Sequence, residues 1–111
     1  MGKATYYPHT QLTLQADVVG AKMWGVALEQ TMLTYFEVPS YCRFETHQHP
    51  SEQITMVLSG TLFFEVNDEV IAVGQGEVIA LPCHVPHAVF TREKAVTAVD
   101  AWSPIPEKYA R

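Results

Sequence analysis

Short runs of β-branched and aromatic residues recur along this sequence, and residues that favour turns separate them. Val, Ile, Thr, Phe and Tyr suit the pleated, half-buried surface of a sheet, whereas Gly, Pro, Asn and Asp end strands. Many short strands divided by turns are typical of an antiparallel sandwich or barrel. The segment Glu29 to Phe36 can also be read as two turns of helix. Thr31, Thr34 and the nearby Pro39 disfavour that alternative.

The pattern therefore predicts an all-β fold. Within it, Gln53 to Val73 is expected to form a meander of three strands, because Ser59-Gly60 and Asn67-Asp68 have the composition of tight turns. The expected strands are Gln11 to Leu14, Lys22 to Leu28, Thr31 to Val38, Arg43 to Thr46, Gln53 to Leu58, Thr61 to Val66, Val70 to Val73, Val78 to Leu81, Ala88 to Thr91 and Val96 to Trp102.

One expected strand, Thr31 to Val38, is apolar on both faces. Phe36 and Val38 fall on one side of it, and Leu33 and Tyr35 fall on the other. A sheet that is apolar on both sides needs a second covering surface. We therefore expect a partner subunit, and a homodimer is the simplest form of one.

A chain of 111 residues fits one domain with its own core. We expect a single domain over residues 1–111, with an N-terminal arm at about residues 1–10 and a C-terminal tail at about residues 103–111. The segment Ser103-Pro104-Ile105-Pro106 cannot continue a central strand. The tail is therefore expected to wrap the outside of the domain or to reach a neighbouring molecule.

Charge and hydropathy exclude some classes of partner. The chain has seven basic and 12 acidic residues, which gives a net charge of -5, so we expect no nucleic-acid partner. No apolar run approaches the roughly 18 to 20 residues that span a bilayer, and the first residues lack an apolar signal core. We expect no membrane association and a cytoplasmic location. Cys42 and Cys83 fit no paired metal spacing and are expected to be free thiols.

Histidines and one glutamine are spaced as metal ligands would be. Successive side chains of a strand point to opposite faces, so His47 and His49 share a face, and Gln53 keeps that parity. His87 follows a Pro-rich corner, Leu81 to Pro86. Three imidazoles and one amide oxygen can hold an ion and leave coordination positions open. Gln53 can also be an ordinary buried amide that bonds to backbone.

These residues stand in two motifs that resemble those of the cupin family, in its small single-domain, RmlC-like form. In the first motif His47, His49 and Gly60 fit, Gln53 replaces the usual glutamate, and Tyr41 stands at the first glycine. The second motif is matched by Gly76, Pro82 and His87, with His84 at a usual glycine and Thr91 at a usual asparagine. The resemblance implies a jelly-roll barrel, a double-stranded β-helix, with a metal between its sheets.

A narrower resemblance is to the pectin-degradation cupins, which are KdgF-like. It rests on Gln53 and on the last strand, Val99-Asp100-Ala101-Trp102-Ser103-Pro104, in which Asp100 and Trp102 share a parity. The resemblance implies that His47, His49, Gln53 and His87 bind one divalent transition metal (Mn, Fe, Ni or Zn). It also implies that Asp100 and Trp102 are catalytic residues facing the metal cavity. Trp102 stands for phenylalanine, and the basic residue expected soon after Ser-Pro is replaced by Pro106.

The activity implied by the resemblance is that of an isomerase or lyase acting on a sugar acid. It converts a 4,5-unsaturated monouronate, a small anionic substrate, to a linear ketonised product. A neutral set of ligands leaves the ion its full charge for Lewis-acid chemistry, and Asp100 can carry the proton. A metal-dependent dioxygenase and a non-catalytic module that binds a small ligand stay open as alternatives. Asp100 can also be a strand-end acid facing solvent.

Overall fold

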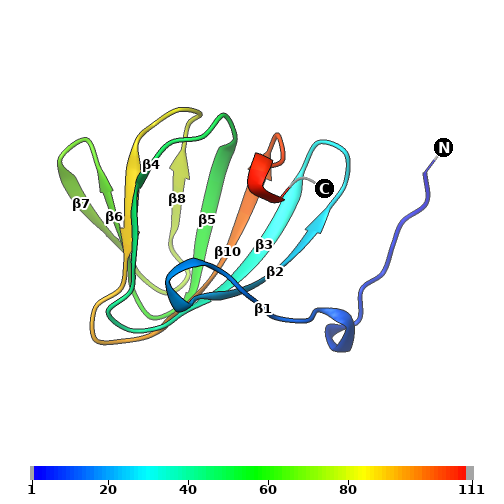
Figure 1. The fold of residues 1–111 in the computed structure, drawn as a ribbon, viewed down its shortest axis with the longest axis horizontal. Helices are drawn as coiled ribbons and strands as arrows, with labels where there is room; N and C mark the ends of the chain where they lie inside the picture. Colours follow the sequence, from blue (N-terminus) through cyan, green and yellow to red (C-terminus); the bar gives the residue numbers. More distant parts are fainter. Residues whose placement is uncertain (1, 110–111) are drawn as a thin grey trace.

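Two antiparallel sheets face each other in the computed structural model, which describes residues 2–109 (Figure 1). The larger sheet has six strands in the order β1-β2-β3-β10-β5-β8, and the smaller has four in the order β4-β9-β6-β7. The strands are β1 (Gln15–Ala16), β2 (Lys22–Ala27), β3 (Met32–Val38), β4 (Arg43–His47), β5 (Glu52–Ser59), β6 (Leu62–Val66), β7 (Glu69–Val73), β8 (Val78–Leu81), β9 (His87–Phe90) and β10 (Val96–Ser103). Three short 3-10 turns complete the elements, η1 (His9–Gln11), η2 (Val18–Gly20) and η3 (Glu107–Tyr109). None of these helical turns, among residues 2–109, has the length that crossing a membrane requires.

The all-β jelly-roll prediction is confirmed, and so are most of the expected strands. Strand β3 begins at Met32 and takes up most of the segment for which a helix was the alternative. Its alternation is as expected, since Phe36 and Val38 are buried between the sheets while Leu33 faces outward. Asn67 and Asp68 both have positive φ, 51° and 63°, and join β6 to β7 as a two-residue hairpin turn.

Two expectations about local structure are wrong. The segment Gln11 to Leu14 is not a strand, because Pro8 starts a 3-10 turn in which the Gln11 N–H donates to the Pro8 carbonyl at 2.8 Å. The three-strand meander is also wrong, because β5 and β6 lie in different sheets. At Gly60, φ is +80°, and the chain crosses between the sheets there instead of closing a hairpin. Strand β5 pairs with β10 and β8.

The space between the sheets is divided into an apolar part and a polar part. Apolar side chains from both sheets fill one end, where Val57 and Phe64 are almost fully buried. Polar side chains that are equally buried, among them Thr34, Thr55 and His87, lie toward the other end. Buried polar groups need hydrogen-bond partners or an ion. The polar end of the barrel is therefore the place to look for a site.

Candidate metal centre

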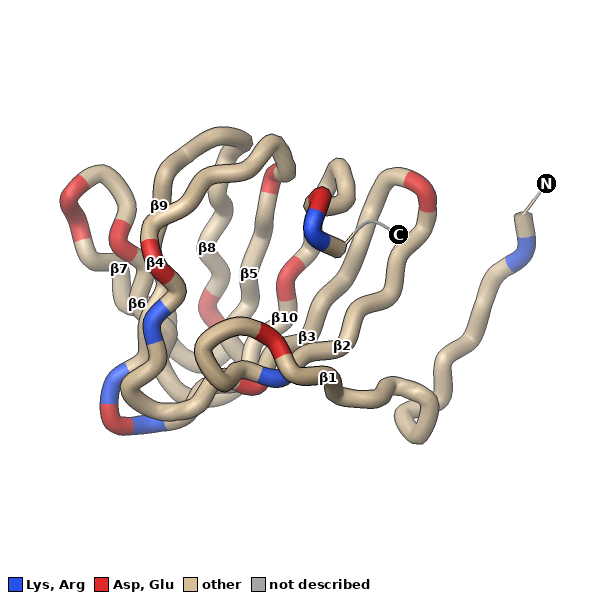
Figure 2. The backbone as a smooth tube through the Cα atoms, viewed as in Figure 1, with Lys and Arg blue, Asp and Glu red and all other residues tan. Residues whose placement is uncertain are grey.

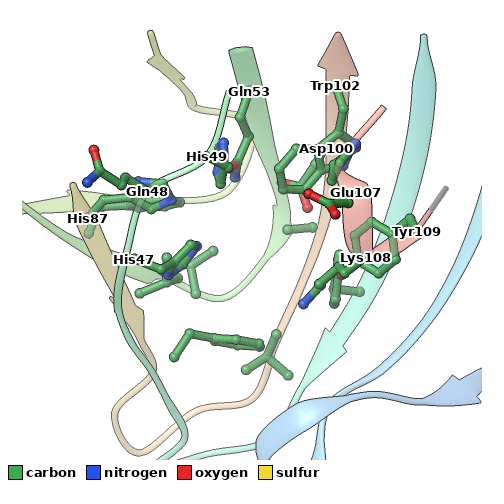
Figure 3. Close-up of a pocket in the computed structure, with 18 of the residues that line it drawn as sticks. His47, Gln48, His49, Gln53, His87, Asp100, Trp102, Glu107, Lys108 and Tyr109 are labelled. Atoms are coloured by element: carbon green, nitrogen blue, oxygen red, sulfur yellow. The ribbon is translucent and has the colours of Figure 1, made fainter. Parts of the chain in front are cut away.

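Three histidines meet at the polar end of the barrel (Figure 3). His47 ends β4 and His87 begins β9, and these strands are paired in the four-stranded sheet so that the two residues are register partners. His49 follows in the loop that leads to β5. Their ligand nitrogens all lie within 4.8 Å of one another. Two ligands of one ion bonded at about 2.1 Å lie at most about 4.2 Å apart, so only a small inward movement closes the cluster on an ion.

Backbone carbonyls fix the tautomer of each imidazole. The Nδ1 atoms lie 2.8 to 2.9 Å from carbonyl oxygens, that of His47 from Glu45, that of His49 from Ser51 and that of His87 from Val85. A carbonyl can only accept, so Nδ1 carries the proton and Nε2 has the lone pair. Such bonds orient metal-binding histidines. Burial lowers the pKa of His87, and neighbouring His47 and His49 act in the same direction, which favours the neutral ligand form.

Gln53 supplies an oxygen to the same cluster. It is buried on β5, and its side-chain N–H donates to the Thr55 hydroxyl at 2.9 Å, which leaves Oε1 directed at His49. His49 Nε2 and Gln53 Oε1 lie 3.1 Å apart. With Nδ1 protonated, both of these atoms present lone pairs, so a cation or a proton between them is needed to make the contact favourable. The donor set therefore fits a divalent ion held by His47, His49, Gln53 and His87.

Asp100 lies in the same cavity, on β10, beside the four candidate metal ligands. Its carboxylate accepts hydrogen bonds from the hydroxyls of Thr55 and Thr34. Burial raises the pKa of Asp100 to about 6 from an ordinary value of 3.8, although the hydrogen bonds from Thr55, Thr34 and Gln53 oppose the shift. A carboxyl with a pKa of about 6 can both hold and release a proton near neutral pH.

Trp102, two residues further along β10, forms one wall of the cavity. Its ring packs edge-on against His49, with centroids 5.3 Å apart. Its indole N–H donates to the Thr34 hydroxyl at 2.8 Å, and Thr34 in turn donates to Asp100. The two residues predicted to face the cavity therefore do so, and one threonine connects them. Thr34 and Thr55 are missing from the sequence prediction, because threonine in a strand is too common to indicate a site.

The cavity has a volume of about 340 Å³ and two unlike halves. The histidines, Gln53 and Asp100 line one half. Aromatic and aliphatic side chains of both sheets line the other. The apolar half consists of Phe36, Val38, Phe44, Leu62, Phe64, Val89 and Ala98. A ligand that fills the whole cavity would contact both kinds of surface.

The C-terminal tail closes one side of this cavity, contrary to the expectation that it wraps the outside or reaches a neighbour. Lys108 and Tyr109 of η3 line the cavity, and Lys108 points its amine toward it (Figure 3). The Tyr109 ring packs against Trp102 at 6.2 Å, and burial raises the pKa of Tyr109. An apolar contact of this kind holds the tail inward. Residues 110 and 111 of the predicted tail lie outside the described residues.

Other candidate residues lie away from the site. His9 and His84 are exposed and are not part of the cluster, as predicted. Arg43 lies outside the cavity, in ion pairs with Glu45 and Glu65, because a bulge between Phe44 and His47 breaks the parity that Arg43 would share with His47. Cys42 is buried and Cys83 is exposed, and both are free thiols.

The departures from the two motifs have a structural explanation. Tyr41 and His84 occupy positions where glycine is usual, and both have positive φ, 52° and 63°. The backbone there keeps the left-handed conformation that glycine adopts most easily. Thr91, at the usual asparagine, accepts a hydrogen bond from the Cys42 N–H and donates to the Pro39 carbonyl. It therefore still ties the end of β9 to the loop before β4.

Comparisons with known proteins agree with this architecture. The family model described as a cupin domain matches residues 34–102. KdgF from Halomonas sp. has a similar structure, with a TM-score of 0.88 and 20% identity over 97% of this chain and 100% of that one. An RmlC-like cupin from Shewanella frigidimarina has a TM-score of 0.85 and 18% identity over 97% of each chain. The polyketide cyclase RemF from Streptomyces resistomycificus has a TM-score of 0.82 and 19% identity over 95% of this chain and 82% of that one. No curated protein matches the sequence.

Proposed function

The chain belongs to the cupin family, and from this premise we propose that it is a metal-dependent enzyme of the isomerase or lyase type. Its proposed substrate is a 4,5-unsaturated monouronate, and its product is the linear ketonised sugar acid. The observation that carries this proposal is the position of Asp100. This buried carboxyl, with a pKa of about 6, shares the cavity with the candidate metal ligands. Those ligands are three histidines and one amide, so none of them is a carboxylate.

The neutral donor set is the first support. His47, His49, His87 and Gln53 would hold one divalent ion, of Mn, Fe, Ni or Zn, without cancelling its charge. When bound, the ion supplies Lewis-acid stabilisation of negative charge on a substrate oxygen. Every other part of the chemistry falls to the side chains of the chain itself.

Asp100 moves the proton in the proposed reaction. In the ring opening the C1–O5 bond breaks, and the anomeric hydroxyl loses its proton as C1 becomes an aldehyde. C4 gains a proton and C5 becomes a ketone, so that the product is an isomer of the substrate. A general acid is most effective when its pKa lies near the working pH. The hydroxyls of Thr34 and Thr55 hold the Asp100 carboxylate in one orientation, and Trp102 limits access from one side. Asp100 and Trp102 are the proposed catalytic residues.

Recognition of an anionic substrate has a candidate group in Lys108. The side chain lines the cavity from η3 and carries a positive charge toward it. A lysine near the cavity opening would pair with the uronate carboxylate. We extend the proposal to a single domain over residues 1–111 that acts in the cytoplasm as a homodimer.

The assay for this proposal follows the loss of the substrate's double-bond absorbance. Purified protein supplied with Mn, Fe, Ni or Zn is expected to accelerate that loss with unsaturated galacturonate, and Asp100→Asn is expected to abolish the acceleration while binding the same amount of metal. No acceleration over buffer with any of the four ions would rule out the substrate. Equal rates for Asp100→Asn and the natural chain would rule out the role of Asp100.

A second function is favoured by the apolar half of the cavity. The cavity offers apolar surface from Phe36, Phe44 and Phe64. A sugar acid does not need this surface, whereas an aromatic substrate would pack against it. A dioxygenase with a redox metal in the same cluster is the corresponding candidate. Oxygen consumption with an aromatic substrate would support it, and equal turnover under nitrogen would exclude it.

A further inference from the structure

Asp100 lies between two threonines of neighbouring strands. It is the only charged residue of β10, and it is the register partner of Thr34 on β3 and of Thr55 on β5 (Figure 2). All three side chains are buried, with exposed fractions of 0% to 6%. The Thr34 hydroxyl donates to Asp100 Oδ2 at 3.2 Å, and the Thr55 hydroxyl donates to Oδ1 at 2.5 Å. Each carboxylate oxygen therefore receives one hydroxyl hydrogen.

Two chains of hydrogen bonds end at Asp100, and each has a threonine in the middle. One begins at the Trp102 indole N–H, which donates to Thr34 at 2.8 Å. The other begins at the Gln53 amide N–H, which donates to Thr55 at 2.9 Å. An indole N–H can only donate, so the first chain has a single possible direction. An amide can donate from its nitrogen or accept at its oxygen, so the Gln53 end of the second chain allows two directions.

The Asp100 carboxylate sets the direction of the second chain. In its ionised form it has no hydrogen to donate, so the Thr55 hydroxyl must direct its single hydrogen at Oδ1. Thr55 then offers Gln53 only a lone pair, which the amide nitrogen can use and the amide oxygen cannot. The nitrogen therefore faces Thr55, and Gln53 Oε1 faces His49, whose Nε2 lies 3.1 Å away.

The neighbouring imidazole by itself favours the opposite orientation of the amide. His49 Nδ1 bonds to the Ser51 carbonyl, so Nε2 has a lone pair. A Gln53 amide turned by 180° would donate an N–H to that lone pair, which is more favourable than the contact of two lone pairs. The turned amide would present a donor to an ion and would also occupy His49 Nε2. It would therefore remove two of the four candidate ligands.

We propose that Thr55 is a positioning residue, which donates to Asp100 and accepts from Gln53 and so keeps the amide oxygen directed at the ion position. Asp100 thereby contributes to metal binding although it is not one of the candidate ligands. The same chain gives a reason for an amide at position 53, because a glutamate there would have no N–H to donate to Thr55. The inference rests on the metal centre of the proposed function, but not on its substrate or its reaction.

Thr34 provides a matched control for Thr55. Both side chains are buried and donate to Asp100, but only Thr55 accepts from Gln53. The dissociation constants for Zn²⁺, Ni²⁺ and Mn²⁺ are measured by competition with a metal-binding dye at pH 8, above the Asp100 pKa of about 6. Thr55→Val is expected to weaken binding about tenfold to 100-fold, and Thr34→Val by less than about threefold. Thr55→Ser, which keeps the hydroxyl, is expected to bind as the natural chain does.

Gln53→Glu tests whether the effect of Thr55 passes through the amide. A carboxylate presents an oxygen in either orientation, so in this background Thr55→Val has no amide to release. There it is expected to change the affinity by less than about threefold. An equal loss in both backgrounds would overturn the proposal, because it would mean that Thr55 acts through packing alone. Equal affinities of Thr55→Val and Thr34→Val would overturn it too, as would a natural chain that binds none of the three ions.

A second measurement covers the case in which Thr55→Val fails to fold. In the metal-free natural chain at pH 8, NMR is expected to show stronger nuclear Overhauser contacts from the Gln53 side-chain amide protons to Thr55 than to the His49 ring. The reverse pattern would mean that the amide donates to His49, and it would contradict the proposal. Failure to turn over unsaturated galacturonate would remove the proposed substrate and leave these results unchanged.

Discussion

His49 Nε2 and Gln53 Oε1 lie 3.1 Å apart with lone pairs on both atoms. The contact exists because each side chain is fixed from its other end. The Ser51 carbonyl holds His49 Nδ1, and the Thr55 hydroxyl holds the Gln53 amide nitrogen. Neither group can turn away without losing a hydrogen bond in a partly buried place, which costs about 1 to 3 kcal/mol. The candidate ligand cluster is therefore already organised in the fold, and it contains an unfavourable contact that a bound ion would relieve.

This contact predicts that divalent metal stabilises the fold. A ligand present at a hundred times its dissociation constant adds about 2.7 kcal/mol to the free energy of unfolding. For a domain of this size the added free energy corresponds to a rise in Tm on the order of 10 °C. Thermal melts of EDTA-treated protein with and without Mn, Fe(II), Ni or Zn measure it. Gln53→Met, which keeps the side-chain volume without the amide oxygen, is expected to show a smaller rise. If His49→Ala responds to the ions as the natural chain does, the histidine cluster is not their site.

Asp100 predicts a pH dependence of stability in the metal-free protein. Its pKa is raised to about 6 in the fold from an ordinary value of 3.8, so between these values the native state binds more protons than the unfolded state. Stability from this group is therefore fully present below about pH 4 and is lost as the pH rises through about 6. The loss is on the order of 3 kcal/mol at 1.36 kcal/mol per pKa unit.

Asp100→Asn removes that titration. Compared with the natural chain, the EDTA-treated variant is expected to be relatively more stable at pH 7 than at pH 4, as measured by urea denaturation at both values. Glu107→Gln, an exposed acid at the cavity mouth, is the control and is expected to follow the natural chain. A constant difference between Asp100→Asn and the natural chain at all pH values would show that the carboxyl does not titrate in this range.

Some of the site could be predicted from the sequence because it depends on local spacing. Alternation along a strand placed Asp100 and Trp102 on one face, and the cluster of His47, His49 and His87 follows from the two motifs. The crossing at Gly60 could not be predicted in this way. The residues of a tight turn have the same composition whether the two strands pair with each other or enter different sheets. Only the long-range pairing of β5 with β8 and β10 determines which sheet β5 joins.

The prediction for the C-terminal tail was wrong for a related reason. The segment Pro104 to Pro106 has no periodicity from which a direction can be inferred, and its fold depends on contacts with distant residues. Ser51 donates to the Pro104 carbonyl, and Tyr109 packs on Trp102. These contacts turn the chain back over the cavity. Lys108 therefore enters the site although nothing in its sequence neighbourhood indicates a ligand.

Two glycines with nearly equal φ give a matched prediction about the fold. At Gly60, φ is +80°, and an added Cβ would lie 2.7 Å from the Ala95 carbonyl oxygen. At Gly76, φ is +78°, and nothing lies within 4 Å of the same position. Gly76→Ala is expected to lower the free energy of unfolding by about 1 kcal/mol, because alanine is strained only by the left-handed backbone conformation. Gly60→Ala must also displace backbone atoms and is expected to lower the free energy of unfolding by about 3 kcal/mol or more. Urea denaturation of both variants tests this. Equal losses would mean that the β5 to β6 crossing relaxes freely.

Lys108 predicts a separable effect on substrate binding. Its exposed amine lies 4.9 Å from the Tyr109 ring centroid and points toward the cavity, so it would meet an anionic ligand at the entrance and not at the reacting atoms. Removing an interaction that is equal in the ground and transition states raises KM and leaves kcat unchanged. For Lys108→Gln we expect about a tenfold higher KM for unsaturated galacturonate, which corresponds to ~1.4 kcal/mol. The difference from the natural chain should shrink at high salt, because the amine is exposed and salt screens it.

Lys94→Gln makes the same change in net charge in the loop before β10, away from the cavity, and is expected to keep the natural KM. Equal KM values for the two variants would assign any effect to net charge. A fall in kcat for Lys108→Gln would instead place the lysine among the groups that act in the transition state.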